Sequence, residues 1–113
     1  MIYLPVLLFA IAAVGGLTLV VMKFSGRGLP WPLVIAHGVF AASGLIILVI
    51  NVFSAQQNFL MNLSLVLFLV AAIGGFTILN FHMRKKKQPG ILIFIHATVA
   101  VISYILLLIS VFG

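Results

Sequence analysis

Four long runs of apolar residues, separated by short polar segments, dominate this sequence. We predict helices over about Tyr3–Met22, Trp31–Phe53, Phe59–Phe81 and Ile91–Phe112. Each run has about 20 residues, the length that an α-helix needs to cross the roughly 30 Å hydrocarbon core of a bilayer. Open strands are not tolerated at that depth, because lipid offers the main chain no hydrogen-bond partner. The pattern therefore predicts an all-α integral membrane four-helix bundle, with residues 1–113 forming a single domain.

The boundaries of the runs agree with helix ends. Pro30 and Pro89 stand at the starts of the second and fourth helices, where the missing N–H of proline costs nothing. The first run has no basic residues before it, unlike a cleaved signal peptide, so we expect it to remain as a membrane span.

The charged residues define an orientation. All six Lys and Arg residues fall in two loops, which hold Lys23 and Arg27, and Arg84, Lys85, Lys86 and Lys87. The loop between the second and third helices carries no charge. Basic loops stay cytoplasmic, so we predict a multi-pass protein of a bacterial-type inner (cytoplasmic) membrane with both termini outside. Nucleic acid is not an expected partner, because the charge is confined to these short loops.

The composition removes most kinds of chemistry. The chain contains no Asp, no Glu and no Cys. This excludes carboxylate acid–base catalysis, intramembrane acidic proton relays, disulfides, thiolate catalysis and covalent haem attachment through cysteine. The side chains that remain for chemistry are mainly His, Thr, Ser, Asn, Tyr and Met.

The sequence contains an internal repeat. Ala12–Thr18 (AAVGGLT) recurs as Ala71–Thr77 (AAIGGFT), an offset of 59 residues, and the same offset without a gap aligns Pro30 with Pro89 and His37 with His96. The copies span about 4–54 and 63–113. Each copy is a helical hairpin, so the fold should consist of two tandem hairpins related by a pseudo-twofold axis along the membrane normal.

The repeat makes two histidines the leading functional candidates. His37 and His96 lie at the same depth, about six residues or roughly 9 Å into their helices. A twofold bundle can direct both imidazoles at its axis. An ionisable residue inside a membrane is costly and is a functional candidate by default.

Glycines lie near the predicted depth of these histidines. Gly15, Gly16, Gly74 and Gly75 leave room for a flat, wide, apolar cofactor to approach the helices closely. The alternative is that they serve close helix packing, because Ala12 and Gly16, like Ala71 and Gly75, form a small-xxx-small pattern.

The ligand set favours haem b. Two histidines without cysteine or carboxylate underfill a zinc site, which takes three or four protein ligands. They suit an iron porphyrin, in which the macrocycle supplies four nitrogens and the protein supplies axial ligands. We therefore expect His37 and His96 to hold a non-covalent haem, with the basic loops near its propionates.

With four spans, histidines in two of them and no cysteine for haem attachment, the chain resembles small four-helix membrane b-type cytochromes. The resemblance covers the whole chain and rests on His37 and His96. It implies one-electron transfer through a bis-histidine haem, in exchange with a quinone or a redox protein. It leaves open a haem-dependent oxidoreductase acting on quinone or oxygen species, and a haem shared across a homodimer. Members with two haems need four ligand histidines, and this chain has three.

Two other functions stay open. The hairpins could form a small transporter or channel with the histidine pair as a metal site or gate, or the protein could be a structural subunit of a membrane complex. His82 is interpreted as an interfacial residue, with a metal or propionate contact as the alternative. Thr18 and Thr77 could either orient the histidine rings or bond to carbonyls of their own helices.

Overall fold

The structure, a computed structural model, describes residues 3–54 and 58–113. Four helices account for nearly all of these residues: α1 (Tyr3–Phe24), α2 (Trp31–Ser54), α3 (Phe59–Met83) and α4 (Gly90–Phe112). Each observed helix end lies within two residues of the end predicted from the apolar runs. The predicted all-α fold of four helices is confirmed.

All four helices are long and apolar enough to span a membrane. They contain 22, 24, 25 and 23 residues, which correspond to lengths of roughly 33 to 38 Å at the α-helical rise and exceed a typical hydrocarbon core. This is the architecture of a multi-pass membrane protein.

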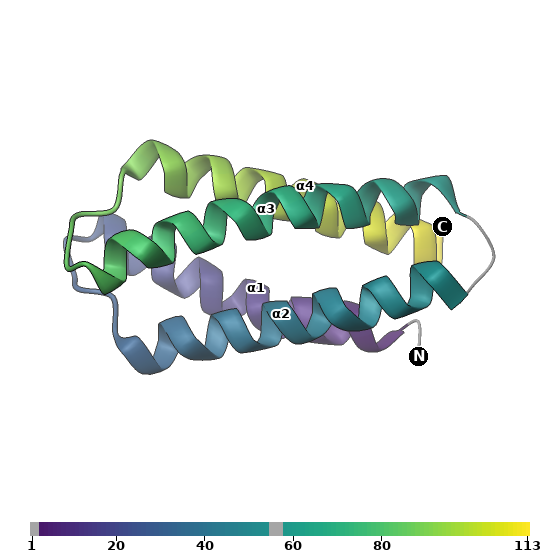
Figure 1. The fold of residues 1–113 in the computed structure, drawn as a ribbon, viewed down its shortest axis with the longest axis horizontal. Coiled ribbons are helices and arrows are strands. Elements are labelled where there is room, and N and C mark those ends of the chain that lie inside the picture. The colour runs from purple at the N-terminus through teal and green to yellow at the C-terminus, as the bar shows by residue number, and fades with distance from the viewer. Residues whose placement is uncertain (1–2, 55–57) are drawn as a thin grey trace. The chain divides into compact units, whose positions relative to one another are not determined.

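The chain divides into two compact units, Met1–Gln56 and Gln57–Gly113. Within the first unit α1 packs along α2, and within the second α3 packs along α4 (Figure 1). Each unit is a helical hairpin that coincides with one copy of the sequence repeat. The pseudo-twofold relation between the hairpins stays a prediction.

The repeat extends to the residues that are buried. The first hairpin buries Phe9, Ala12, Gly44 and Leu48. The second hairpin buries their counterparts 59 positions later, which are Phe68, Ala71, Ser103 and Leu107. On each helix these positions follow one another at intervals of three or four residues, which places them on one helical face. The duplicated sequence therefore encodes a duplicated pattern of burial.

The hairpins differ at a pair of repeat positions that is polar in the second copy and apolar in the first. In the second hairpin the Ser64 hydroxyl donates to the carbonyl oxygen of Ser103 at 2.8 Å, and both side chains are fully buried. The first hairpin has Pro5 and Gly44 at these positions, and there the ring of Phe9 lies where a Cβ on Gly44 would meet it at 3.2 Å. A hydrogen bond between helices in one copy thus corresponds to apolar packing in the other.

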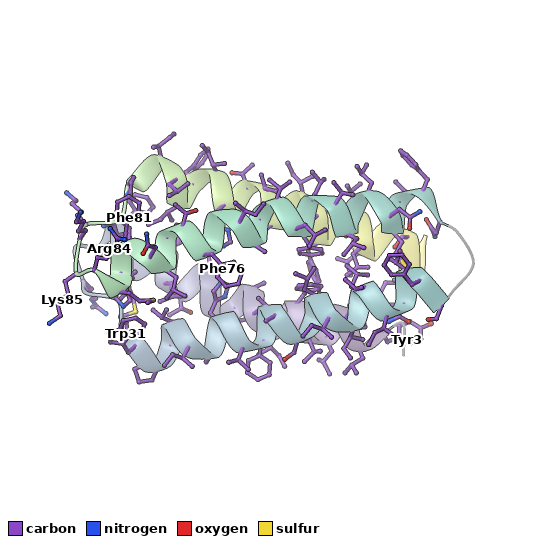
Figure 2. The ribbon with its side chains drawn as sticks, in the orientation of Figure 1. Tyr3, Trp31, Phe76, Phe81, Arg84 and Lys85 are labelled. Carbon is purple, nitrogen blue, oxygen red and sulfur yellow. The ribbon has the colours of Figure 1, made fainter. Side chains whose placement is uncertain are left out.

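Large apolar side chains cover the outer surfaces of the helices. Val14, Leu17 and Ile35 are 69%, 66% and 57% exposed, respectively. Such surfaces fit contact with lipid, where apolar exposure carries no penalty. Aromatic residues lie at both ends of the first hairpin, with Tyr3 at one end and Trp31 at the other (Figure 2).

Both basic loops begin with the same helix-terminating turn. After α1 the Arg27 N–H donates to the Met22 carbonyl, and after α3 the Lys86 N–H donates to the Phe81 carbonyl, at 2.9 Å in each case. These bonds span five residues, as in the Schellman motif, which requires a left-handed residue just beyond the helix. Gly26 supplies it after α1 with φ of 78°, and its repeat counterpart Lys85 supplies it after α3 with φ of 56°.

We predict opposite stability effects at these two turns. Gly26→Ala should destabilise the protein by about 1 kcal/mol, because a Cβ is unfavourable in the left-handed region. Lys85→Gly should stabilise it by about 0.5 kcal/mol, since relief of the same strain is partly offset by the greater freedom of glycine in the unfolded chain. Thermal unfolding in detergent, followed by circular dichroism, measures both.

Lys86→Gly is the matched control for the loss of charge. It removes one lysine from the same loop at a position without positive φ. A stabilisation by Lys86→Gly equal to that by Lys85→Gly would contradict the explanation from backbone conformation.

Candidate functional site: two carbonyl-bonded histidines

His37 is attached to the neighbouring helix of its own hairpin. Its ring nitrogen Nδ1 lies 2.8 Å from the carbonyl oxygen of Ala12, a buried residue of α1. A carbonyl oxygen can only accept a hydrogen bond, so Nδ1 carries the proton and donates it. The side chain is partly buried.

His96 repeats this arrangement in the second hairpin. Its Nδ1 lies 2.7 Å from the carbonyl oxygen of Ala71, the repeat counterpart of Ala12. In both hairpins the acceptor lies 25 residues before the histidine. The sequence repeat therefore reproduces one specific hydrogen bond between side chain and main chain, in addition to the helices.

The bond determines the tautomer of each ring. A neutral imidazole with its proton on Nδ1 has the basic lone pair on Nε2. Histidines that bind metals through Nε2 commonly donate Nδ1–H to a carbonyl or carboxylate, which orients the ring and raises the basicity of the ligand. The bonds to Ala12 and Ala71 give His37 and His96 this form whenever the ring is neutral, and a main-chain carbonyl provides it without a carboxylate in the membrane.

The four predicted glycines lie beside the two histidines, and three of them (Gly16, Gly74 and Gly75) lie beside ring atoms. A Cβ built on Gly16 would lie 2.8 Å from His37 Cε1, and one built on Gly75 would lie 3.1 Å from His96 Cε1. At Gly15 the nearest atom would be His37 Cβ at 3.6 Å, and at Gly74 His96 Cβ and Nδ1 would both lie at 3.6 Å. The glycines thus provide space for histidine rings within each hairpin, while their predicted contact with a cofactor stays a prediction.

Thr18 and Thr77 bond to carbonyls of their own helices and do not orient the histidine rings. Thr18 Oγ1 donates to the Val14 carbonyl at 2.8 Å, and Thr77 Oγ1 donates to the Ile73 carbonyl at 2.9 Å. Both hydroxyls therefore bond to their own helices, four residues back. The residues that orient the histidines are Ala12 and Ala71, through their carbonyls.

His82 has the opposite tautomer. The amide Nε2 of Gln88, a buried residue in the loop between α3 and α4, donates to His82 Nδ1 at 2.9 Å. The ring proton therefore lies on Nε2, which gives His82 a different chemistry from His37 and His96. Its hydrogen bond connects the end of α3 to the loop that holds Lys85. This loop begins with Arg84 and Lys85, which Figure 2 labels. The interfacial interpretation of His82 stays a prediction.

The structure brings the predicted site residues together within each hairpin. His37 lies where a Cβ on Gly15 or Gly16 would meet it in the first, and His96 lies where a Cβ on Gly74 or Gly75 would meet it in the second. The joint use of His37 and His96 stays a prediction. Among the residues that the structure describes, no three histidine, cysteine or acidic side chains gather as a metal-binding group.

The two carbonyl acceptors and the partner of His82 are not predicted from the sequence pattern. Every residue has a carbonyl, so composition cannot single one out. A signal exists in the repeated combination of alanine, a glycine pair three and four residues later, and a histidine 25 residues after the alanine.

Comparison with known proteins finds no matching family model, curated protein or solved structure.

We predict three distinct histidine signatures in the metal-free protein. In ¹⁵N-histidine NMR spectra of detergent-solubilised protein with neutral imidazoles, His37 and His96 should show a protonated Nδ1, and His82 a protonated Nε2. Single His→Gln variants assign the signals. Detection of Nε2–H tautomers at His37 and His96 would contradict the bonds to Ala12 and Ala71.

Proposed function

We propose that this protein is a membrane b-type haem protein that transfers single electrons, with His37 and His96 as the axial ligands of one non-covalent haem. The observation that carries the proposal is the repeated bond from imidazole Nδ1–H to a main-chain carbonyl. In the neutral state it gives two equivalent imidazoles, each with its lone pair on Nε2. A bis-histidine haem requires two such donors.

The donor set fits haem better than a site made of protein ligands alone. A structural zinc site takes three or four protein ligands, and the third histidine of the chain has the other tautomer and a buried amide partner. A porphyrin supplies the remaining four nitrogens itself. Its apolar faces match the apolar spans, which are free of acidic residues.

The residues of the chain have separate roles in this proposal. His37 and His96 bind iron through Nε2, and the carbonyls of Ala12 and Ala71 hold the rings and their protons in place. The basic loops, with Lys23, Arg27 and Arg84–Lys87, provide counter-charge for the propionates. The bound haem iron supplies one-electron chemistry between its ferric and ferrous states.

Electron transfer in the membrane requires a partner that gives electrons to the haem and takes them from it. We propose a quinone or a redox protein as electron donor and acceptor, since one haem cannot by itself carry an electron across the bilayer. The proposed orientation is that of a bacterial-type cytoplasmic membrane protein, with both basic loops cytoplasmic and both termini outside.

The optical spectrum of the purified protein tests the haem assignment. We expect Soret and α bands in the dithionite-reduced minus oxidised spectrum and one haem per chain. His37→Ala and His96→Ala should each abolish the bis-histidine spectrum, and exogenous imidazole should partly restore it by filling the vacated space. Folding of each variant is checked by circular dichroism.

His82→Ala is the matched control and should retain the full spectrum, because His82 is bonded within the loop region of the second hairpin. A protein that stays colourless after incubation with haem would contradict the proposal, as would bands that survive both substitutions. Stoichiometric metal in a colourless protein, or ion flux in liposomes, would instead favour a transporter or channel.

We also predict the membrane orientation, which cysteine labelling can measure because the chain has no native cysteine. In intact cells a membrane-impermeant maleimide should label Ser54→Cys, at the end of α2, and should label Lys87→Cys only after lysis. The reverse pattern would place the basic loops outside and contradict the proposed orientation.

A further inference from the structure

We propose that Gly16 and Gly75 are positioning residues that hold the imidazoles against the carbonyls of Ala12 and Ala71, and thereby set the direction and the ligand strength of His37 and His96. The inference rests on the proposed haem function for its meaning. It rests on geometry within each hairpin for its evidence.

Residue 16 has no room for a side chain beside the His37 ring. A Cβ on Gly16 would lie 2.8 Å from His37 Cε1 and 3.2 Å from His37 Nδ1. Carbon atoms in contact prefer separations of about 3.5 to 4.0 Å, so a methyl group at this position must displace the ring. The imidazole can therefore lie against α1 in this position only because residue 16 has no side chain.

The space beside residue 16 is linked to the hydrogen bond of His37 with Ala12. In an α-helix the Ala12 carbonyl accepts the N–H of the residue four positions later, which is Gly16. The His37 ring shares this carbonyl through its Nδ1–H at 2.8 Å. To reach the oxygen, the ring must pass beside residue 16, so pressure on Cε1 from a side chain there moves the edge of the ring that bears both nitrogens.

The two glycines of each pair differ in how close a side chain on them would come to the histidine. A Cβ on Gly15 or Gly74 would lie 3.6 Å from the nearest histidine atom, which is an ordinary van der Waals contact. Alanine fits at these positions without moving the ring. The adjacent glycines thus differ in role, and Gly15→Ala and Gly74→Ala are matched controls on the same helices.

The two hairpins differ in the distance from the histidine ring to a Cβ built on the nearer glycine. The nearest approach is 2.8 Å at Gly16 and 3.1 Å at Gly75. Gly16→Ala should therefore disturb His37 more than Gly75→Ala disturbs His96. This graded effect is not expected if the glycines serve only to bring helices together.

The experiment compares the four alanine variants in two measurements. In the haem-loaded protein, Gly16→Ala should weaken haem affinity by about 10- to 100-fold, as loss of an oriented ligand does. It should also raise the reduction potential, because a ligand that no longer donates Nδ1–H to a carbonyl is a weaker donor to ferric iron. Gly75→Ala should act in the same direction less strongly. Gly15→Ala and Gly74→Ala serve as controls in the metal-free protein, where they should leave the histidine Nδ1–H signals unchanged.

The second measurement needs no haem. In ¹⁵N-histidine NMR of the metal-free protein, Gly16→Ala should shift or broaden the His37 Nδ1–H signal and leave that of His96 unchanged. If Gly16→Ala does not fold, Gly75→Ala carries the same test on His96. Variants at residues 16 and 75 that match those at 15 and 74 in the histidine spectrum would overturn the inference.

The two measurements distinguish failure of the inference from failure of the proposed function. Haem binding that is insensitive to Gly16→Ala and Gly75→Ala overturns the positioning role and leaves the haem ligands intact. Absence of haem binding in the unmodified protein overturns the proposed function, and with it the assignment of His37 and His96 as ligands whose strength the glycines set.

Discussion

The hydrogen bond from a histidine Nδ1–H to a carbonyl of the adjacent helix is the interaction on which each hairpin's candidate site depends. It forms at 2.8 Å for His37 and 2.7 Å for His96. A ring can reach a carbonyl on another helix only where that helix presents no side chain beside the oxygen. The glycine pairs satisfy this requirement, so the spacing of alanine, glycines and histidine follows from one contact.

The duplication shows which features this contact requires. The residues around the imidazole are the same in both hairpins, namely the alanine, the glycine pair and the histidine. Further along the helices Pro5 and Gly44 correspond to Ser64 and Ser103, and apolar packing corresponds to a hydrogen bond between helices. The packing tolerates different chemistry there because any pair that fills the space and satisfies its polar atoms is acceptable.

The sequence predicts the helices well because bilayer thickness sets their length, and the observed ends lie within two residues of the predicted ones. The sequence also indicates His37 and His96 as candidate site residues, since a gapless repeat aligns them. It does not identify the carbonyls of Ala12 and Ala71, because an acceptor present in every residue leaves no compositional signal. For the small residues near the histidines the sequence offers a cofactor pocket or close helix packing, and the structure places the histidines themselves beside the glycines. How the hairpins combine stays a prediction, because the repeat implies symmetry without specifying the surfaces that meet.

Because the chain has no acidic residues, no carboxylate side chain can orient His37 or His96. Metal-binding histidines are often oriented by carboxylates, but a carboxylate within a membrane span is a costly buried charge. A main-chain carbonyl performs the same orienting role and remains neutral, and its second lone pair is available without breaking the helix. The histidine and its acceptor therefore add no fixed charge inside the spans. Any negative charge on the proposed cofactor must then be balanced by the basic loops, which are the only places where this chain carries charge.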